Sequence, residues 1–125
     1  MSPTVWKAKG SKAKLDVTFR TGEDTPAIVN ISFYGNKTTP RNVSSVSLRG
    51  KEIECPLEFS FIIFAAPDKN ELRVSFFADK DELVELLKAE PITLAAQVDG
   101  IEYVHTPKKN FYKLKDKFLI AISVH

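Results

Sequence analysis

The chain has 125 residues, of which 43% are hydrophobic and 27% are charged. This length is typical of one domain, and the composition excludes an intrinsically disordered chain. We therefore expect a single all-β domain over residues 1–125. Cys55 is the one cysteine, which excludes an intrachain disulfide and a cysteine-based metal site.

Charge is unevenly distributed along the sequence. Residues 1–51 carry a net charge of +6, residues 52–102 a net charge of −8, and residues 103–125 a net charge of +4. If the two basic segments meet in the fold, the molecule has a basic face and an acidic face. The alternative is that these charges decorate the solvated faces of strands, which need a polar side.

The first half of the chain predicts strands. Residues 1–11, with Trp6 among lysines, are interpreted as a flexible arm or an edge segment. Apolar and polar residues then alternate with the period of two that is typical of a half-buried strand. A polar turn over residues 21–26 and a polar loop over residues 35–42 separate the strands. The alternating stretches are residues 13–20, 27–34 and, more weakly, 43–49.

The longest sheet-like run covers residues 53–66. Its two faces differ at the start, where one face carries glutamates, but both are apolar at the end around Ile62 and Phe64. The run therefore predicts a strand that begins with one wet face and ends buried on both. Pro56 cannot donate a ladder hydrogen bond, which indicates an edge position or a bulge there. A further strand is predicted around residues 72–76.

Residues 79–90 predict the only helix. Asp79 suits the N-cap, and Glu82 stands three residues later as in a capping box. One apolar stripe with helical spacing follows, and Pro91 prevents the helix from continuing. The stripe consists of Leu83, Val84, Leu86 and Leu87.

Residues 92–105 predict a hairpin. The period changes to two over residues 92–98, and Asp99-Gly100 suits the positive φ angles of a type I′ turn. Residues 101–105 then return antiparallel, which places Leu94 opposite His105. A short strand over residues 111–114 and a terminal strand over residues 118–124 complete the prediction.

These elements predict a mainly β fold. Eight or nine strands at regular spacing are typical of an antiparallel β-sandwich, of Ig-like or jelly-roll type, or of a barrel. The single short helix at residues 79–90 would then be a crossover or a lid. Periodicity alone leaves the choice between sandwich and barrel open.

Catalytic motifs are absent from the sequence. It contains no nucleophile elbow, no phosphate-binding glycine loop and no calcium loop, so we expect no cofactor, no metal site and no catalytic residues. His105 is interpreted as a structural histidine at the margin of the core. Three Asn-x-Ser/Thr sequons are candidate glycan sites only in a secretory pathway, and otherwise arise by chance in polar turns. They begin at Asn30, Asn36 and Asn42.

The segment over residues 103–117 is the most suggestive of binding. Aromatic residues alternate there with lysines, as in proteins that stack bases and track a phosphate backbone. The alternative is that its aromatic residues belong to the core and its lysines protect an edge strand. The candidate binding residues are Tyr103, His105, Lys108, Lys109, Phe111, Tyr112 and Lys113.

The expected function is a non-enzymatic interaction module. It would engage a protein partner through a sheet edge or through loops, with a homo-oligomer formed through an edge strand as one form of this contact. Two alternatives remain: a barrel that binds nucleic acid through residues 103–117, and a small-ligand or hydrolytic site that no motif reveals. The longest apolar runs are too short to span a membrane as helices. The chain is expected in the cytoplasm if it is complete, and in the periplasm or outside the cell if a leader was removed.

Overall fold

The computed structural model describes residues 1–19 and 25–123. Nine strands form one antiparallel sheet in the order β5-β4-β8-β9-β1-β2-β3-β7-β6. The elements are β1 (Thr4–Ala8), β2 (Ser11–Thr18), β3 (Ala27–Tyr34), β4 (Val43–Arg49), β5 (Glu54–Pro56), β6 (Glu58–Ala66), the 3-10 turn η1 (Pro67–Lys69), β7 (Glu71–Ala78), α1 (Lys80–Leu87), β8 (Thr93–Val98), β9 (Ile101–Pro107) and α2 (Asn110–Ser123).

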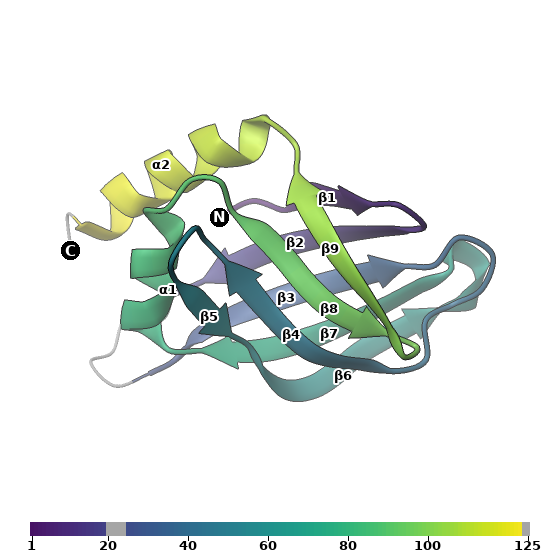
Figure 1. The fold of residues 1–125 in the computed structure, drawn as a ribbon. Coiled ribbons are helices and arrows are strands. Elements are labelled where there is room, and N and C mark those ends of the chain that lie inside the picture. Colours follow the sequence, from purple (N-terminus) through teal and green to yellow (C-terminus); the bar gives the residue numbers. More distant parts are fainter. Residues whose placement is uncertain (20–24, 124–125) are drawn as a thin grey trace.

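The sheet curls into a nearly closed barrel, with both helices at one end and the β8–β9 turn near the other (Figure 1). The prediction of a mainly β, antiparallel fold is confirmed, and the barrel is the alternative that the structure adopts. Pairing of β1 with β9, which joins Trp6 to Pro107, links the two halves of the sheet. This contact connects residues about a hundred positions apart, so local periodicity could not predict it.

The N-terminal segment is a strand in the middle of the sheet, where a flexible arm was one expectation. β1 lies between β9 and β2, and Met1 donates its terminal ammonium to Val17 O at 2.9 Å. Trp6 is completely buried, and its Nε1 donates to Thr4 Oγ1 at 2.9 Å. The indole thus finds both an apolar core and a hydrogen-bond acceptor, which orders the chain end. The turn predicted over residues 21–26 lies mostly outside the described residues.

Helix α1 confirms the predicted helix. The Asp79 side chain accepts a hydrogen bond from Glu82 N at 2.9 Å, as an N-cap residue does. The stripe packs on the barrel, because Leu83, Leu86 and Leu87 are buried. The helix therefore closes one end of the barrel.

The β8–β9 hairpin also confirms its prediction. Asp99 and Gly100 have φ angles of +50° and +83°, which a type I′ turn requires. Val98 faces Ile101 and Leu94 faces His105, in the expected register.

The C-terminal segment is helix α2, so the two strands predicted over residues 111–114 and 118–124 are wrong. Phe111 and Lys115 are buried, and Leu114 and Phe118 are half-buried, which is the spacing of one helical face. Phe111 packs edge-on against Trp6 with ring centroids 4.7 Å apart. This contact fixes α2 on the barrel, and it overrides the β-propensity of the isoleucines near the end of the chain.

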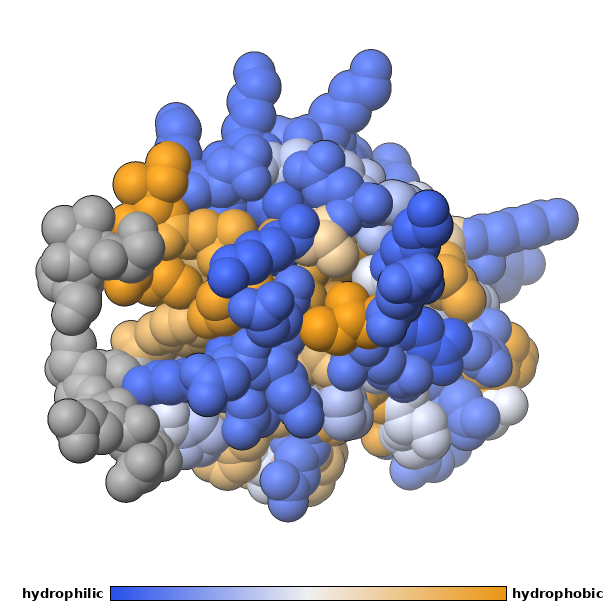
Figure 2. Space-filling view, turned by 60° about the vertical axis from the view of Figure 1, so that its left-hand side comes forward, coloured by the Kyte–Doolittle hydropathy of each residue, from blue (hydrophilic) through white to orange (hydrophobic). Residues whose placement is uncertain are grey.

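The helix end of the molecule presents a mostly hydrophilic surface. Figure 2 shows hydrophilic side chains projecting from it, with hydrophobic surface gathered beside the grey atoms at the left of the view. Neither helix in the described part of the chain has the length and apolar character needed to cross a membrane.

Candidate functional site

Strand β6 exposes a row of large apolar side chains. Phe59, Phe61 and Ile62 are 57%, 55% and 52% exposed, and Phe64 is 43% exposed. β6 is also the last strand of the sheet, with β7 on one side and, among the described strands, none on the other. Native proteins usually cover such an edge or place charges on it. An uncovered apolar row of this size is typical of an interaction site.

Two bulges explain why apolar side chains reach both faces of β6. Its register against β7 shifts between Phe59 and Phe61, and again between Ile62 and Phe64. Each bulge adds one residue to the strand and changes the direction of the side chains that follow. Phe59 and Ile62 therefore face the same side as the buried residues of β7, whereas Phe61 and Phe64 face the outside.

The single strand predicted over residues 53–66 is wrong in two respects. The run breaks at Leu57, whose N–H donates to Val46 O at 2.9 Å before the chain turns to pair with β7. The apolar end of the run is exposed and not buried on both faces, because no second layer covers it. The expectation for Pro56 is confirmed, since it ends the edge strand β5.

The barrel stays open along a seam between residues 43–45 of β4 and residues 59–66 of β6. β4 pairs with β5 only from Ser47 to Arg49, so its first three residues have no described strand on this side. Two cavities, of about 240 Å³ and 640 Å³, follow the seam. Arg41, Ile62 and Leu72 line both of them. The two cavities therefore form one continuous groove.

The groove has an apolar floor and one basic residue on its wall. Leu72 and Val74 of β7 form the floor, and Arg41 lies on the wall opposite β6. Asp99 holds this wall in place, because its Oδ1 accepts hydrogen bonds from the backbone N–H groups of Arg41 and Asn42, each at 2.9 Å. The Asp99 side chain thus ties the β8–β9 turn to the segment that enters β4.

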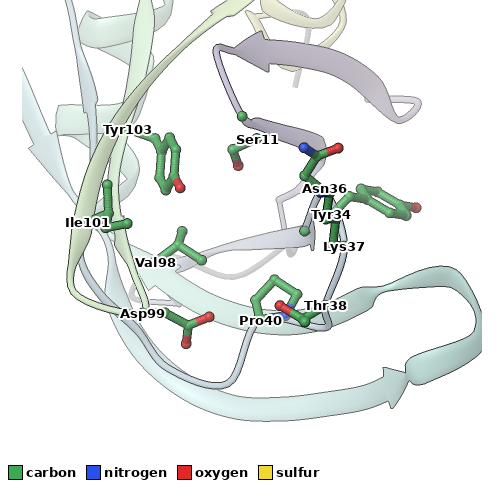
Figure 3. A pocket seen from close by; sticks show the side chains of 12 residues that line it. Ser11, Tyr34, Asn36, Lys37, Thr38, Pro40, Val98, Asp99, Ile101 and Tyr103 are labelled. Carbon is green, nitrogen blue, oxygen red and sulfur yellow. The ribbon is translucent and has the colours of Figure 1, made fainter.

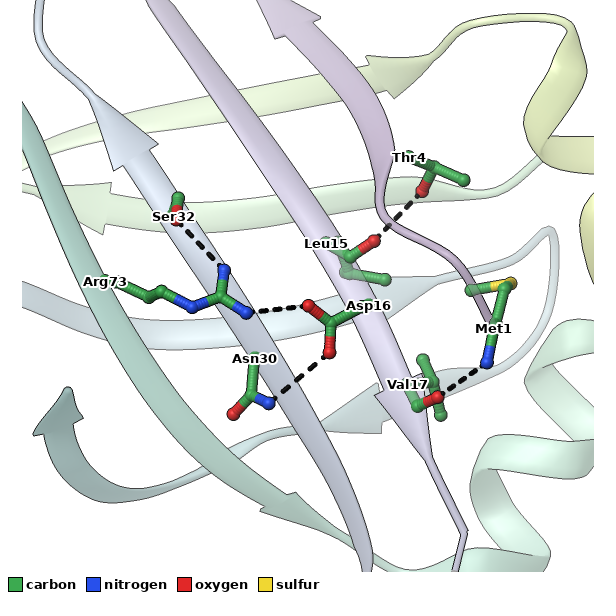
Figure 4. A network of polar contacts seen from close by, with 8 residues as sticks. All are labelled: Met1, Thr4, Leu15, Asp16, Val17, Asn30, Ser32 and Arg73. Carbon is green, nitrogen blue, oxygen red and sulfur yellow. Dashed lines mark hydrogen bonds and ion pairs between the residues drawn. The ribbon is translucent and has the colours of Figure 1, made fainter. Parts of the chain in front are cut away.

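A polar network covers the outer face of the neighbouring strands (Figure 4). Arg73 Nη2 donates to Asp16 Oδ2 at 2.7 Å, and Arg73 Nη1 donates to Ser32 Oγ at 3.1 Å. Asn30 Nδ2 completes the network with a bond of 3.3 Å to Asp16 Oδ1. The charge of Arg73 is therefore satisfied within the molecule. Phe64 lies directly opposite Arg73, at the margin of this network.

The candidate binding residues of segment 103–117 are not brought together as one surface. Phe111 and His105 are buried in the core, so neither ring is available to a base. Tyr112 Oη accepts a hydrogen bond from Ile92 N at 3.3 Å, and Tyr103 lies at the opposite end of the barrel from α2. Lys108, Lys109 and Lys113 are exposed. The lysines thus lack the stacking aromatic residues that single-strand binding uses.

A third cavity, of about 320 Å³, opens at the barrel end away from the helices (Figure 3). Ser11 and Tyr103 direct hydroxyl groups into it, whereas the Tyr34 side chain points away from it. Ser11 Oγ lies 2.9 Å from His105 Nε2, while His105 Nδ1 lies 3.3 Å from Leu94 O. Both ring nitrogens are therefore occupied within the fold, as expected for a structural histidine.

Two titratable groups of the core, His105 and Cys55, are held neutral. Burial lowers the pKa of His105, against a smaller opposing effect of the Leu94 carbonyl. Burial also raises the pKa of the Cys55 thiol to about 11, helped by the charges of Glu82 and Asp79. Cys55 is thus not a reactive thiolate. Within residues 1–19 and 25–123, no three His, Cys, Asp or Glu side chains are grouped as metal ligands.

The fold and the seam define the class of this protein: a small antiparallel β-barrel with an open seam and an exposed apolar edge strand. Compared with protein-family models, with curated proteins and with solved structures, the chain matches none. Its function is therefore argued from the site alone.

Sequence reasoning identified β6 as apolar on both faces but placed it in the core. The signal that could have corrected this is the absence of a matching partner. Most of the other predicted strands have a polar face, so they do not offer two apolar layers to enclose it.

Proposed function

We propose that the protein is a non-enzymatic interaction module that engages a protein partner through the edge strand β6. The observation that carries this proposal is the exposure of five large apolar side chains on the edge strand β6, namely Phe59, Phe61, Ile62, Ile63 and Phe64. Burying them on a partner removes apolar surface from water, at about 25 cal/mol for each Å². Edge strands also bind partners by strand addition, which gives both affinity and direction.

Site-specific photocrosslinking tests this proposal. A photoreactive phenylalanine analogue replaces Phe61 on β6 in one variant and Val104 on β9 in the other. Both positions are exposed and apolar, at 55% and 47%, so they form a matched pair. In source cells we expect a discrete adduct from position 61 and none from position 104. Equal labelling at both positions, or no adduct at position 61, contradicts the proposal.

A double substitution supplies the complementary test. Phe61→Ser with Phe64→Ser removes two exposed aromatic side chains from β6 and should abolish partner capture. Ile101→Ser with Val104→Ser removes exposed apolar surface from β9 and should leave capture unchanged, because neither residue lines the groove or belongs to β6.

A second candidate function is the binding of a small polar ligand at the barrel mouth. It is favoured by the cavity of about 320 Å³, whose lining residues include the polar Ser11, Asn36, Lys37 and Tyr103. A cavity of this size falls within the range of ligand pockets. A fragment screen by protein-observed NMR tests it: bound fragments should shift Tyr103 and Asn36, and Tyr103→Ala should abolish those shifts. Shifts confined to other surfaces contradict this function.

A further inference from the structure

The seam offers more than an exposed strand, because two strand segments bound it, and each has no described strand paired with it on the side of the seam. Residues 43–45 of β4 and residues 59–66 of β6 face it from opposite sides, with Leu72 and Val74 as the floor between them. The seam edge of β6 leaves backbone N–H and C=O groups without a strand partner. An extended segment can pair with these groups, whereas a helix already pairs its own backbone groups and cannot.

We infer that the seam binds an extended peptide segment of a different protein, with alternate apolar residues and a carboxylate near its middle. This inference rests on the proposed function and specifies the partner's chemistry. Alternate side chains of an extended segment point to the same side, so one set would lie on the apolar floor. Strand addition along β6 would hold the backbone of the segment.

The carboxylate follows from the position of Arg41. Arg41 lines both cavities together with Ile62 and Leu72, so it lies at the middle of the groove. In the described part of the chain, no carboxylate forms an ion pair with its guanidinium. A carboxylate on the bound segment would accept two parallel hydrogen bonds from it, which is the geometry that arginine favours.

The unpaired charge of Arg41 also disfavours a second copy of this chain as the occupant. If β6 of another copy entered the seam, its one acidic residue, Glu58, would lie at the first position of the strand, and residues 59–66 would place no carboxylate at the middle of the groove. Arg41 would then be covered without a partner charge, and covering an unpaired charge is costly. A segment from a different protein can supply the missing carboxylate.

Peptide selection tests the inference. A phage library of random 12-residue peptides is selected on the intact protein, and an enriched peptide is then made with a fluorescent label. We expect enriched peptides to alternate apolar residues around an Asp or Glu. Binding measured by fluorescence polarisation should weaken about tenfold in Arg41→Glu, the factor that about 1.4 kcal/mol produces. Lys51→Glu, a control of the same charge change outside the groove, should leave binding unchanged.

A charge exchange gives the sharpest readout. Replacing the acidic residue of the peptide by Lys should weaken binding to the natural protein and restore binding to Arg41→Glu. Rescue of this kind depends on the contact itself, so loss of folding cannot imitate it.

Three results would overturn the inference. After each of them, the proposed function can still be tested by itself. Peptide binding that Arg41→Glu leaves intact but Phe61→Ser with Phe64→Ser abolishes places docking on the outer face of β6 and retains the proposed function. A dimer in sedimentation equilibrium that Ile62→Ser dissociates makes a second copy the occupant. No enriched peptide at all rejects the inference, and the photocrosslinking at position 61 then decides the function independently.

Discussion

At the scale of single residues, His105 is a residue type often found in active sites, but here its ring is buried and both its nitrogens have hydrogen-bond partners within the fold. Burial lowers its pKa, so the imidazole is neutral in the folded protein. With Leu94 O as acceptor, Nδ1 carries the proton, and Nε2 accepts a hydrogen bond from the Ser11 hydroxyl. The ring thereby joins β9 to β8 and to the start of β2.

This arrangement predicts a pH-dependent stability. In the unfolded chain His105 regains its ordinary pKa of 6.5, so the unfolded state binds a proton first as the pH falls. Stability is therefore complete above that value and declines as the pH falls toward the lower pKa of the folded state. Urea unfolding at about pH 7.5 and about pH 5.5 should show this decline. The decline should be smaller in His105→Gln. Equal declines would contradict the assignment.

At the scale of elements, the two helices differ in how far the sequence predicts them. An N-cap residue, a single apolar stripe and a following proline predict α1, and the structure confirms this helix. α2 lacks such a cap signal, and the isoleucines at its end favour a strand by propensity. What stabilises the helix is the packing of Phe111 on Trp6, which lies more than a hundred residues earlier in the sequence. Long-range packing of this kind has no local signature.

The α1 stripe predicts a large effect of a buried charge. Leu86 is completely buried, so Leu86→Asp should lower the free energy of unfolding by about 3 to 5 kcal/mol. Glu85→Asp places the same residue type at an exposed position one residue earlier and should cost under about 0.5 kcal/mol. Urea unfolding measures both values. A loss below about 0.5 kcal/mol for Leu86→Asp would mean that the stripe does not pack on the barrel.

Substitutions at the exposed aromatic residues of strand β6 should have the opposite effect, namely a small loss of stability. Because Phe61 and Phe64 are about half exposed, Phe61→Ser with Phe64→Ser should lower stability by no more than about 1 kcal/mol. Phe76→Ser on the neighbouring strand should cost about 3 kcal/mol or more, since Phe76 is 2% exposed. Thermal or urea unfolding of the two variants gives the comparison. Similar losses in both would show that β6 serves the core and not a partner.

At the scale of the whole molecule, the sequence predicts the strands but not how the sheet closes. β3 and β4 have the predicted bounds, and the hairpin at Asp99 has the predicted register. Barrel closure depends instead on β1 meeting β9, and the seam depends on the break at Leu57. Closure arises from pairing between distant segments, and the break arises where Leu57 pairs back to Val46 of β4; a local period of two carries no information on either. The candidate site could not be predicted for the same reason, because it exists only where closure is incomplete.

Asp99 links the β8–β9 turn to the seam, and this predicts a local change in dynamics. Its carboxylate accepts the N–H groups of Arg41 and Asn42, which hold the wall of the groove. Asp99→Gly keeps the positive φ angle of the turn but removes both hydrogen bonds, so hydrogen exchange at these two amides should accelerate about tenfold. Asp99→Asn retains an acceptor oxygen and should accelerate exchange less. Amides of β3, which lies away from this turn, should exchange as before. Unchanged exchange at Arg41 and Asn42 in Asp99→Gly would mean that the wall is held by the strands alone, and peptide affinity at the seam would then be independent of Asp99.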